Sequence, residues 1–92
     1  MIVRWTKPAA DDLNHICDYT EKRFGAAQAR RAAIAIYDSA DALKDMPLRS
    51  RAGRKPGTRE LAVAGFPFVI IYCAGQEAVE VVRILHGSQQ WP

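Results

Sequence analysis

The C-terminal third of the chain carries three short apolar runs separated by turn-forming residues: Leu61–Ala64, Phe68–Cys73 and Ala78–Leu85. Each run is rich in Val, Ile, Phe or Tyr and is bounded by Gly or Pro, which is typical of consecutive antiparallel strands. The middle run is apolar at both alternating sets of positions, so it predicts a strand that is covered on both faces. We therefore expect a three-stranded meander.

The last of these runs has polar residues near the end of an otherwise apolar strand. Strict alternation places Val79, Val81, Arg83 and Leu85 on one face, and Glu80, Val82, Ile84 and His86 on the other. Arg83 and His86 thus emerge close to the C-terminus, and this end of the strand is where we look for function.

The N-terminal half predicts a short strand and two helices. Ile2–Trp5 is the strand, and Thr6 and Pro8 are suited to the start of the helix that follows. That helix ends before Gly25, and its apolar stripe recurs at spacings of three and four: Ala9, Leu13, Ile16, Cys17, Thr20 and Phe24.

A second helix is expected over Ala26–Met46, with Pro47 as its terminator. Its apolar stripe comprises Ala29, Ala33, Ile36, Ala40 and Leu43. The single glycine between the helices predicts an antiparallel helical hairpin.

Together these elements predict an α+β fold in the order β-α-α-β-β-β, as a single domain over residues 1–92. We expect an antiparallel sheet with the helical hairpin packed on one face, and the first strand beside the last. Because Phe68–Cys73 is apolar on both sides, the face away from the helices should also be partly apolar, and an exposed face of that kind is usually covered by a partner.

Composition places the chain among ordinary globular proteins, with 49% apolar and 25% charged residues in 92. No apolar run approaches the roughly 18 residues that span a membrane, and the start lacks the apolar segment of a signal peptide, so we expect a cytoplasmic protein without membrane contact. Cys17 and Cys73 form no CxxC and no His/Cys cluster. They are interpreted as small core residues, with no metal and no cofactor expected.

The positive charge is concentrated in the second half of the chain. Residues 1–46 carry 7 basic and 7 acidic side chains, whereas residues 47–92 carry 6 and 3, which accounts for the net charge of +3. The loop Pro47–Thr58 alone contributes Arg49, Arg51, Arg54 and Lys55 without one acid. It is interpreted either as a contact for phosphate or an acidic partner, or as a solvated loop that keeps the protein soluble.

The order of several segments resembles the ParE branch of the RelE/ParE superfamily, the toxins of bacterial type II toxin–antitoxin pairs. The segments are KPAADDLNHICDY, LKDMP, GTREL, FPFVIIY and VVRILHGSQQW, and they span nearly the whole chain. The resemblance implies the β-α-α-β-β-β fold and a growth-inhibiting, plasmid-stabilising protein held inactive by a cognate antitoxin. ParE-like members poison DNA gyrase, whereas RelE-like members cut mRNA on the ribosome.

Three residues match the positions that RelE-like enzymes use for cleavage: Arg59, Arg83 and His86. Each also has a structural interpretation, the arginines as partners of Glu60, Glu77 or Glu80 and the histidine as a hydrogen-bonded strand end. The tail after His86 contains no Tyr, Lys or Arg, so some of the catalytic side chains expected of a RelE-like enzyme are absent. Gln89 also stands where ParE members often carry arginine, which suggests a weakened toxin or one that uses its basic loop instead.

Three hypotheses follow, in order of preference: a non-enzymatic toxin that binds gyrase, an mRNA endonuclease, and a degenerate member that binds only its antitoxin. The endonuclease hypothesis would be favoured if Arg59, Arg83 and His86 converged within a few ångströms on one open face. The antitoxin is the expected partner in every case, and nucleic acid is expected only indirectly, through the target or the antitoxin complex. The candidate contacts for target or partner are Arg49, Arg51, Arg54, Lys55 and Trp91.

Overall fold

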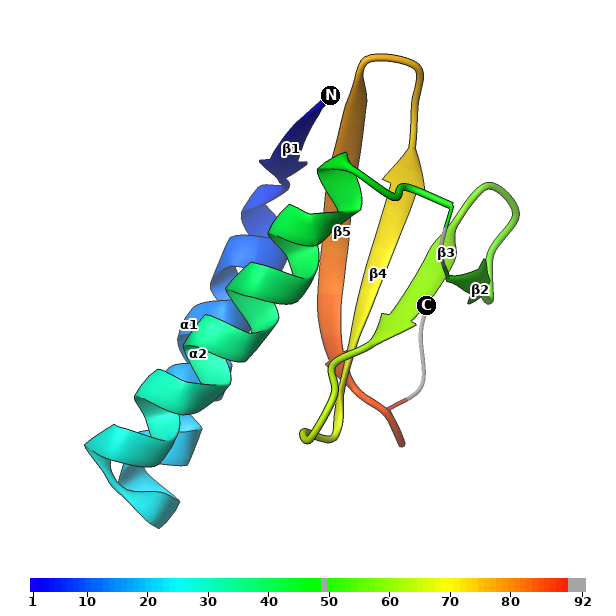
Figure 1. Cartoon of the computed structure of the whole chain (residues 1–92). Helices are drawn as coiled ribbons and strands as arrows, with labels where there is room; N and C mark the ends of the chain where they lie inside the picture. Colours follow the sequence, from blue (N-terminus) through cyan, green and yellow to red (C-terminus); the bar gives the residue numbers. More distant parts are fainter. Residues whose placement is uncertain (49, 90–92) are drawn as a thin grey trace.

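The computed structural model describes residues 1–48 and 50–89, and these form a mixed five-stranded sheet flanked by two long helices (Figure 1). The helices are α1 (Lys7–Phe24) and α2 (Ala26–Asp41), followed by a 3₁₀ turn over Ala42–Lys44. The strands are β1 (Ile2–Trp5), β2 (Arg51–Ala52), β3 (Arg59–Ala62), β4 (Phe68–Ala74) and β5 (Ala78–His86), in the spatial order β1-β5-β4-β3-β2. The α+β fold expected from the sequence is confirmed.

Local chemistry sets the ends of α1 where the sequence predicted them. The Thr6 hydroxyl accepts a hydrogen bond from the Ala9 amide (3.2 Å), and Pro8 lies in the first turn, where its missing N–H costs nothing. At the other end Gly25 adopts φ 92°, a left-handed conformation that favours glycine. The chain therefore turns directly from α1 into α2, and the two helices form the antiparallel hairpin (Figure 1).

The helices differ from prediction in three details. Regular α-helix ends at Asp41 rather than Met46, and the chain continues as the 3₁₀ turn, the tighter form common at the ends of α-helices. Phe24, predicted on the apolar stripe, is 68% exposed because the hairpin extends beyond the sheet (Figure 1). On α2, Ala32 is buried while Ala33 is only half-buried, so the buried stripe is rotated by one residue there.

The sheet contains the predicted meander, with β3, β4 and β5 paired antiparallel in sequence order. β1 lies beside β5, as expected, but the pair is parallel, which makes the sheet mixed rather than antiparallel throughout. The predicted loop Pro47–Thr58 contributes the additional two-residue strand β2, which pairs with Glu60 and Arg59 at the opposite edge.

Register along β5 changes at a bulge, and this corrects the faces predicted for its last residues. Tyr72 lies opposite Val81 and Ile71 opposite Arg83, so Val82 is the extra residue. Beyond the bulge the alternation is reversed. Ile84 and His86 therefore share the helix-covered face with Val81, whereas Arg83 and Leu85 lie on the other face.

Both faces of the sheet are packed. The larger cluster joins Ile36, Ala40 and Leu43 of the helical layer to Ile70 and Tyr72 of β4. On the far face Val69, Ile71 and Leu85 are 7%, 0% and 1% exposed. The prediction of an apolar far face is thus correct, but the expectation that it lies exposed for a partner is wrong, because the chain itself buries these side chains.

Candidate functional site

A groove of about 600 Å³ opens between the helical hairpin, the β3–β4 connection and the end of β5. Its apolar wall consists of Ile16, Phe24, Ala32, Phe66, Pro67, Phe68 and Ile84. Its polar groups are Asp12, His15, Tyr19, Thr20, Gln28, His86 and Gln89. The groove exists because the hairpin leans away from the sheet toward its turn, leaving the lower part of α1 and α2 without a strand against it (Figure 1).

Aromatic side chains at the groove are held at fixed positions on neighbouring elements. Phe66 and Phe68 flank Pro67 and stack with ring centroids 6.3 Å apart. Tyr19 projects from α1 and is 57% exposed. Rings of this kind bury large areas at low entropic cost, so the groove is suited to apolar side chains of a partner.

His86 lies at the rim of this groove rather than on an open catalytic surface. Its ring packs edge-on against Phe68 (centroids 6.4 Å apart), and its Nδ1 accepts a hydrogen bond from the Ser88 amide (3.3 Å). The Ser88 hydroxyl lies 2.8 Å from the same nitrogen. His15, on α1, is exposed and also lines the groove.

Arg83 is engaged in a contact that the sequence did not reveal. Its Nε and Nη2 donate to the two carboxylate oxygens of Asp12 at 2.7 and 2.9 Å, and the Ile84 amide donates to the same carboxylate at 2.9 Å. The hydrogen bond to Asp12 raises the pKa of the Arg83 guanidinium above its ordinary value, against the opposing effect of burial. Asp12 thus accepts hydrogen bonds from the edge of β5 beyond the point where β1 ends. These contacts hold the Arg83 side chain in place.

Thr6, six residues before Asp12, completes the same junction. Its amide donates to the Val81 carbonyl (3.0 Å) and its hydroxyl to the Val82 carbonyl (2.8 Å). Beyond the end of β1, Thr6 and Asp12 therefore form the hydrogen bonds to the backbone groups along the edge of β5. The first turn of α1 holds no acidic residue, and Asp12, in the second turn, binds the edge of β5.

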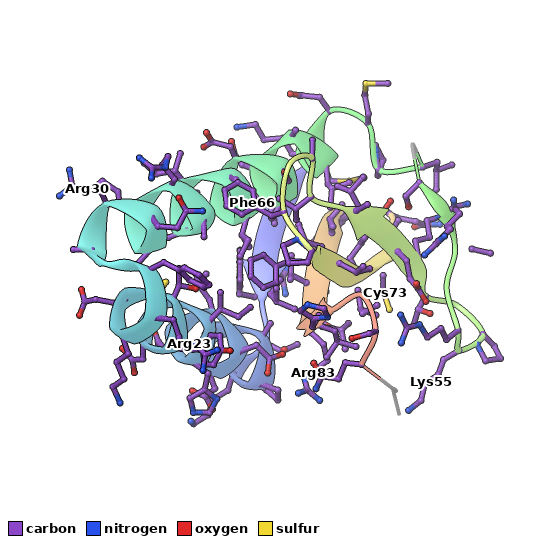
Figure 2. The ribbon with its side chains drawn as sticks, turned by 90° about the horizontal axis from the view of Figure 1, so that it is seen from below. Arg23, Arg30, Lys55, Phe66, Cys73 and Arg83 are labelled. Carbon is purple, nitrogen blue, oxygen red and sulfur yellow. The ribbon has the colours of Figure 1, made fainter. Side chains whose placement is uncertain are left out.

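The basic loop is largely satisfied within the chain. Glu60, on β3, is 4% exposed and accepts from the Arg51 Nη2 (3.3 Å) and from the Arg54 amide (2.9 Å), while Arg54 Nε lies 3.1 Å from its carboxylate. Arg54 Nη1 also donates to the Gln89 carbonyl (2.6 Å), which joins the loop to the segment after β5. Lys55 projects from this loop (Figure 2).

Arg59 also has an internal partner, although not the one predicted. Its Nη1 donates to the Ser50 carbonyl at 2.9 Å. The same stretch is anchored by the buried Tyr72, whose hydroxyl donates to the Pro47 carbonyl (2.8 Å) and contacts the Ser50 hydroxyl (2.5 Å). These contacts hold the segment after α2 against the sheet. Two further candidates, Arg49 and Trp91, lie outside the described residues.

The structure does not bring Arg59, Arg83 and His86 together. Arg83 is on the far face, opposite Ile71, while Arg59 and His86 lie opposite Tyr72 and Phe68 on the helix side. Tyr72 and Phe68 are four residues apart on β4, which corresponds to roughly 13 Å. Convergence within a few ångströms, the condition set for the nuclease hypothesis, is therefore not met. Within residues 1–48 and 50–89, no group of three or more His, Cys, Asp or Glu is suited to hold a metal ion.

The two cysteines are free and half-buried, so they contribute to packing less completely than predicted. Burial raises the pKa of both thiols, and nearby acidic side chains add to the effect. Neither helix of the described chain is long and apolar enough to cross a membrane.

Comparison with known proteins gives a consistent picture. Residues 3–91 match the family model described as the ParE toxin of the type II toxin–antitoxin system parDE. A putative toxin, Y4kP, of Sinorhizobium fredii is 40% identical over 98% of this chain and 92% of its own length. Toxin RelE2 of Caulobacter vibrioides is 37% identical over 95% of this chain and 96% of its own.

Solved structures agree with these sequence matches. A chain of the chromosomal ParDE toxin–antitoxin system of P. aeruginosa superposes with a TM-score of 0.85 at 25% identity, covering 94% of this chain and 95% of that one. A chain of the RelBE2 toxin–antitoxin complex of Mycobacterium tuberculosis gives 0.67 at 23% identity, over 92% and 88%, and so shares the fold.

Proposed function

Because the chain belongs to the ParE family of toxins of type II toxin–antitoxin systems, we propose that it arrests growth by binding DNA gyrase without catalysing a reaction. We further propose that a cognate antitoxin neutralises it by laying an apolar segment in the groove. It would act in the bacterial cytoplasm, where gyrase is found. Gyrase as target rests on the resemblance to ParE-like members.

The groove carries the antitoxin part of this proposal. It combines a volume of about 600 Å³, an apolar wall of Ile16, Phe66, Phe68 and Ile84, and the exposed ring of Tyr19. An amphipathic segment binds such a groove through apolar side chains at helical or alternating spacing. The polar rim of Asp12, His15 and His86 supplies hydrogen-bond partners that fix the register of the segment.

The state of the candidate catalytic residues supports binding rather than cleavage. Phosphodiester cleavage needs a base, an acid and a cation at the same phosphate. Here Arg83 is held by Asp12, Arg59 is bonded to a backbone carbonyl, and His86 is separated from both. A binding toxin requires no such convergence.

A pair of tyrosines provides a matched test of the groove. Tyr19 lines the groove and is 57% exposed, whereas Tyr37 lies on α2 outside it, stacks on Trp5, and is 58% exposed. Calorimetric titration with the antitoxin encoded beside this gene should show that Tyr19→Ala weakens binding about tenfold or more, as expected for an aromatic at the centre of an interface. Tyr37→Ala should change it less than threefold.

In cells, the Tyr19→Ala variant should still arrest growth and should need more antitoxin for rescue than the unmodified protein. Equal losses for the two tyrosine variants, or a loss for Tyr37→Ala alone, would place the antitoxin elsewhere. Normal growth on expression of the unmodified protein would instead favour a member that binds antitoxin without being toxic.

A further inference from the structure

The turn between α1 and α2 carries a cluster of cations that the proposed function does not use. We call this cluster the hairpin tip; it comprises Lys22, Arg23, Arg30 and Arg31. All four lie within two helical turns of Gly25, on helices with 3.6 residues per turn. Arg30 points outward beside this turn, away from the sheet (Figure 2). Only two acids, Asp18 and Glu21, lie in the same stretch of sequence.

Charge at the hairpin tip is not offset as it is elsewhere in the molecule. Lys7, Lys44, Arg51, Arg54 and Arg83 each form an ion pair with a carboxylate. None of the four tip cations does so within residues 1–48 and 50–89. The loop that looked basic in the sequence is thus partly neutralised by Glu60, while the four tip cations form no ion pair with a carboxylate of the described residues and lie at the other end of the molecule (Figure 1).

The contacts that the tip arginines do make leave their charge intact. Arg31 donates to the neutral side-chain oxygen of Gln28 at 3.0 and 2.7 Å, which orients the guanidinium. Arg23 places its guanidinium carbon 5.3 Å from the centre of the Tyr19 ring. The N-terminus of α2 lies at the same point without a side-chain cap, but the C-terminus of α1 lies beside it and its opposite dipole offsets that of α2, so the positive charge of the tip comes from its side chains.

An exposed aromatic ring stands among these charges. Phe24 is the last residue of α1 and is 68% exposed, flanked in sequence by Lys22 and Arg23. Arginines that bind phosphate oxygens through two N–H groups, beside a ring on which a base can stack, are the combination used by proteins that bind single strands. Phe24 also belongs to the wall of the groove, so its ring lies where the groove meets the hairpin tip; an acidic protein surface would satisfy the charges but would offer this ring no stacking partner.

We propose that the hairpin tip binds nucleic acid directly, through phosphate contacts from Lys22, Arg23, Arg30 and Arg31 and stacking of a base on Phe24. The site is sequence-independent, since no element of it reads base edges. It would hold the toxin on nucleic acid presented by its target, a direct contact beyond the indirect one expected from the sequence. The proposal does not depend on which target the toxin inhibits.

The test uses the purified full chain and fluorescein-labelled 20-nucleotide DNA, single-stranded and duplex, in fluorescence anisotropy titrations from 50 to 200 mM NaCl. Four phosphate contacts predict a slope of log K against log salt of about −2.8 for the single strand and about −3.6 for the duplex. Single-strand binding should therefore weaken about 50-fold over this range. The double variant Arg30→Gln/Arg31→Gln should halve the slope, because two of the four contacts are lost.

Matched controls separate the tip from the general charge of the protein. Lys7→Gln/Lys44→Gln removes the same two charges from residues that are already ion-paired, and it should leave the slope within about 0.5 of the original. Phe24→Ala should weaken single-strand binding about fivefold or more and leave duplex binding unchanged. Circular dichroism of each variant confirms that the helices are retained.

The proposal is overturned if the two double variants lower the slope equally, since binding would then follow net charge alone. It is also overturned if no binding is measurable at 50 mM NaCl, or if Phe24→Ala has no effect on the single strand. Poly-glutamate of equal charge that displaces the oligonucleotide with equal potency would identify the tip as a contact for an acidic protein instead.

Discussion

The junction between Asp12, Arg83 and Ile84 offers the sharpest test of how the fold is held together. Asp12→Ala removes two hydrogen bonds from the Arg83 guanidinium and one from the Ile84 amide. The side chains of Asp12 and Arg83 are 14% and 31% exposed, so water only partly replaces the lost contacts. Hydrogen bonds to charged groups contribute about 1.5–3 kcal/mol each, and an unsatisfied amide costs about 1–3 kcal/mol.

Because these terms overlap, we expect Asp12→Ala to lower the free energy of unfolding by about 2–4 kcal/mol. With a urea m-value of about 1 kcal/mol/M, the unfolding midpoint should fall by about 2–4 M. Asp12→Asn keeps an oxygen for the Ile84 amide and should lose about half as much. The measurement is urea unfolding followed by far-UV circular dichroism.

Asp11→Ala is the natural control, since it removes a neighbouring carboxylate whose partner, Lys7, has a side chain 85% exposed. Surface pairs of this kind contribute little, so the change should be below about 0.5 kcal/mol. A double-mutant cycle between Asp12→Ala and Arg83→Met should give a coupling energy of about 1.5–3 kcal/mol. A coupling near zero, or equal effects of the Asp11 and Asp12 variants, would refute the reasoning.

Three further predictions follow from other contacts. Glu60→Ala should release the basic loop and lower the free energy of unfolding by about 1–3 kcal/mol. Trypsin should then cleave faster within residues 51–58, and unchanged cleavage would show that other contacts hold the loop. Burial raises the pKa of Cys17 and Cys73, so iodoacetamide at pH 8 should react more slowly with the folded protein than with the protein in urea; equal rates would contradict this. The stability that the protonated thiols contribute should be lost as pH rises through their raised pKa. Arg51→Glu/Lys55→Glu should slow association with the antitoxin and reduce its salt dependence, and no change in either would remove the loop from that interface.

The sequence predicts what periodicity and turn chemistry determine. The order of elements, the hairpin at Gly25 and the three-stranded meander follow from apolar spacing and the placement of Gly and Pro. The position of β1 beside β5 is also correct, but its parallel direction depends on how α1 continues along the β5 edge, which periodicity does not report.

The site was harder to predict because its key feature is an interruption of the pattern. Strict alternation along β5 placed Arg83 with Val81, whereas the bulge at Val82 moves it to the other face. A bulge depends on pairing with the neighbouring strand and leaves no mark in a run of apolar residues. The partner of Arg83 is Asp12, 71 residues away in sequence, and only the packing of α1 on the sheet edge brings the two together.

The sequence shows how many charged side chains each segment carries, but not which of them form ion pairs. Arg51 and Arg54 drew attention because their loop contains no acid, yet Glu60, just beyond that loop, binds both. Arg30 and Arg31 were unremarkable in a chain half with balanced charge, although they carry no carboxylate partner in the described structure. Spatial pairing, which is absent from a linear charge count, decides which cations remain available to a partner.

Inhibition of purified DNA gyrase tests the central claim most directly. The reaction contains gyrase, ATP, relaxed plasmid and increasing toxin, scored for lost supercoiling and for trapped cleaved DNA. We predict dose-dependent inhibition that the cognate antitoxin relieves and that Arg59→Ala/His86→Gln leaves within threefold of the original, because the proposed mechanism gives neither side chain a catalytic role. Full supercoiling at high toxin concentration, together with mRNA cleavage on ribosomes that the same double variant abolishes, would contradict the account.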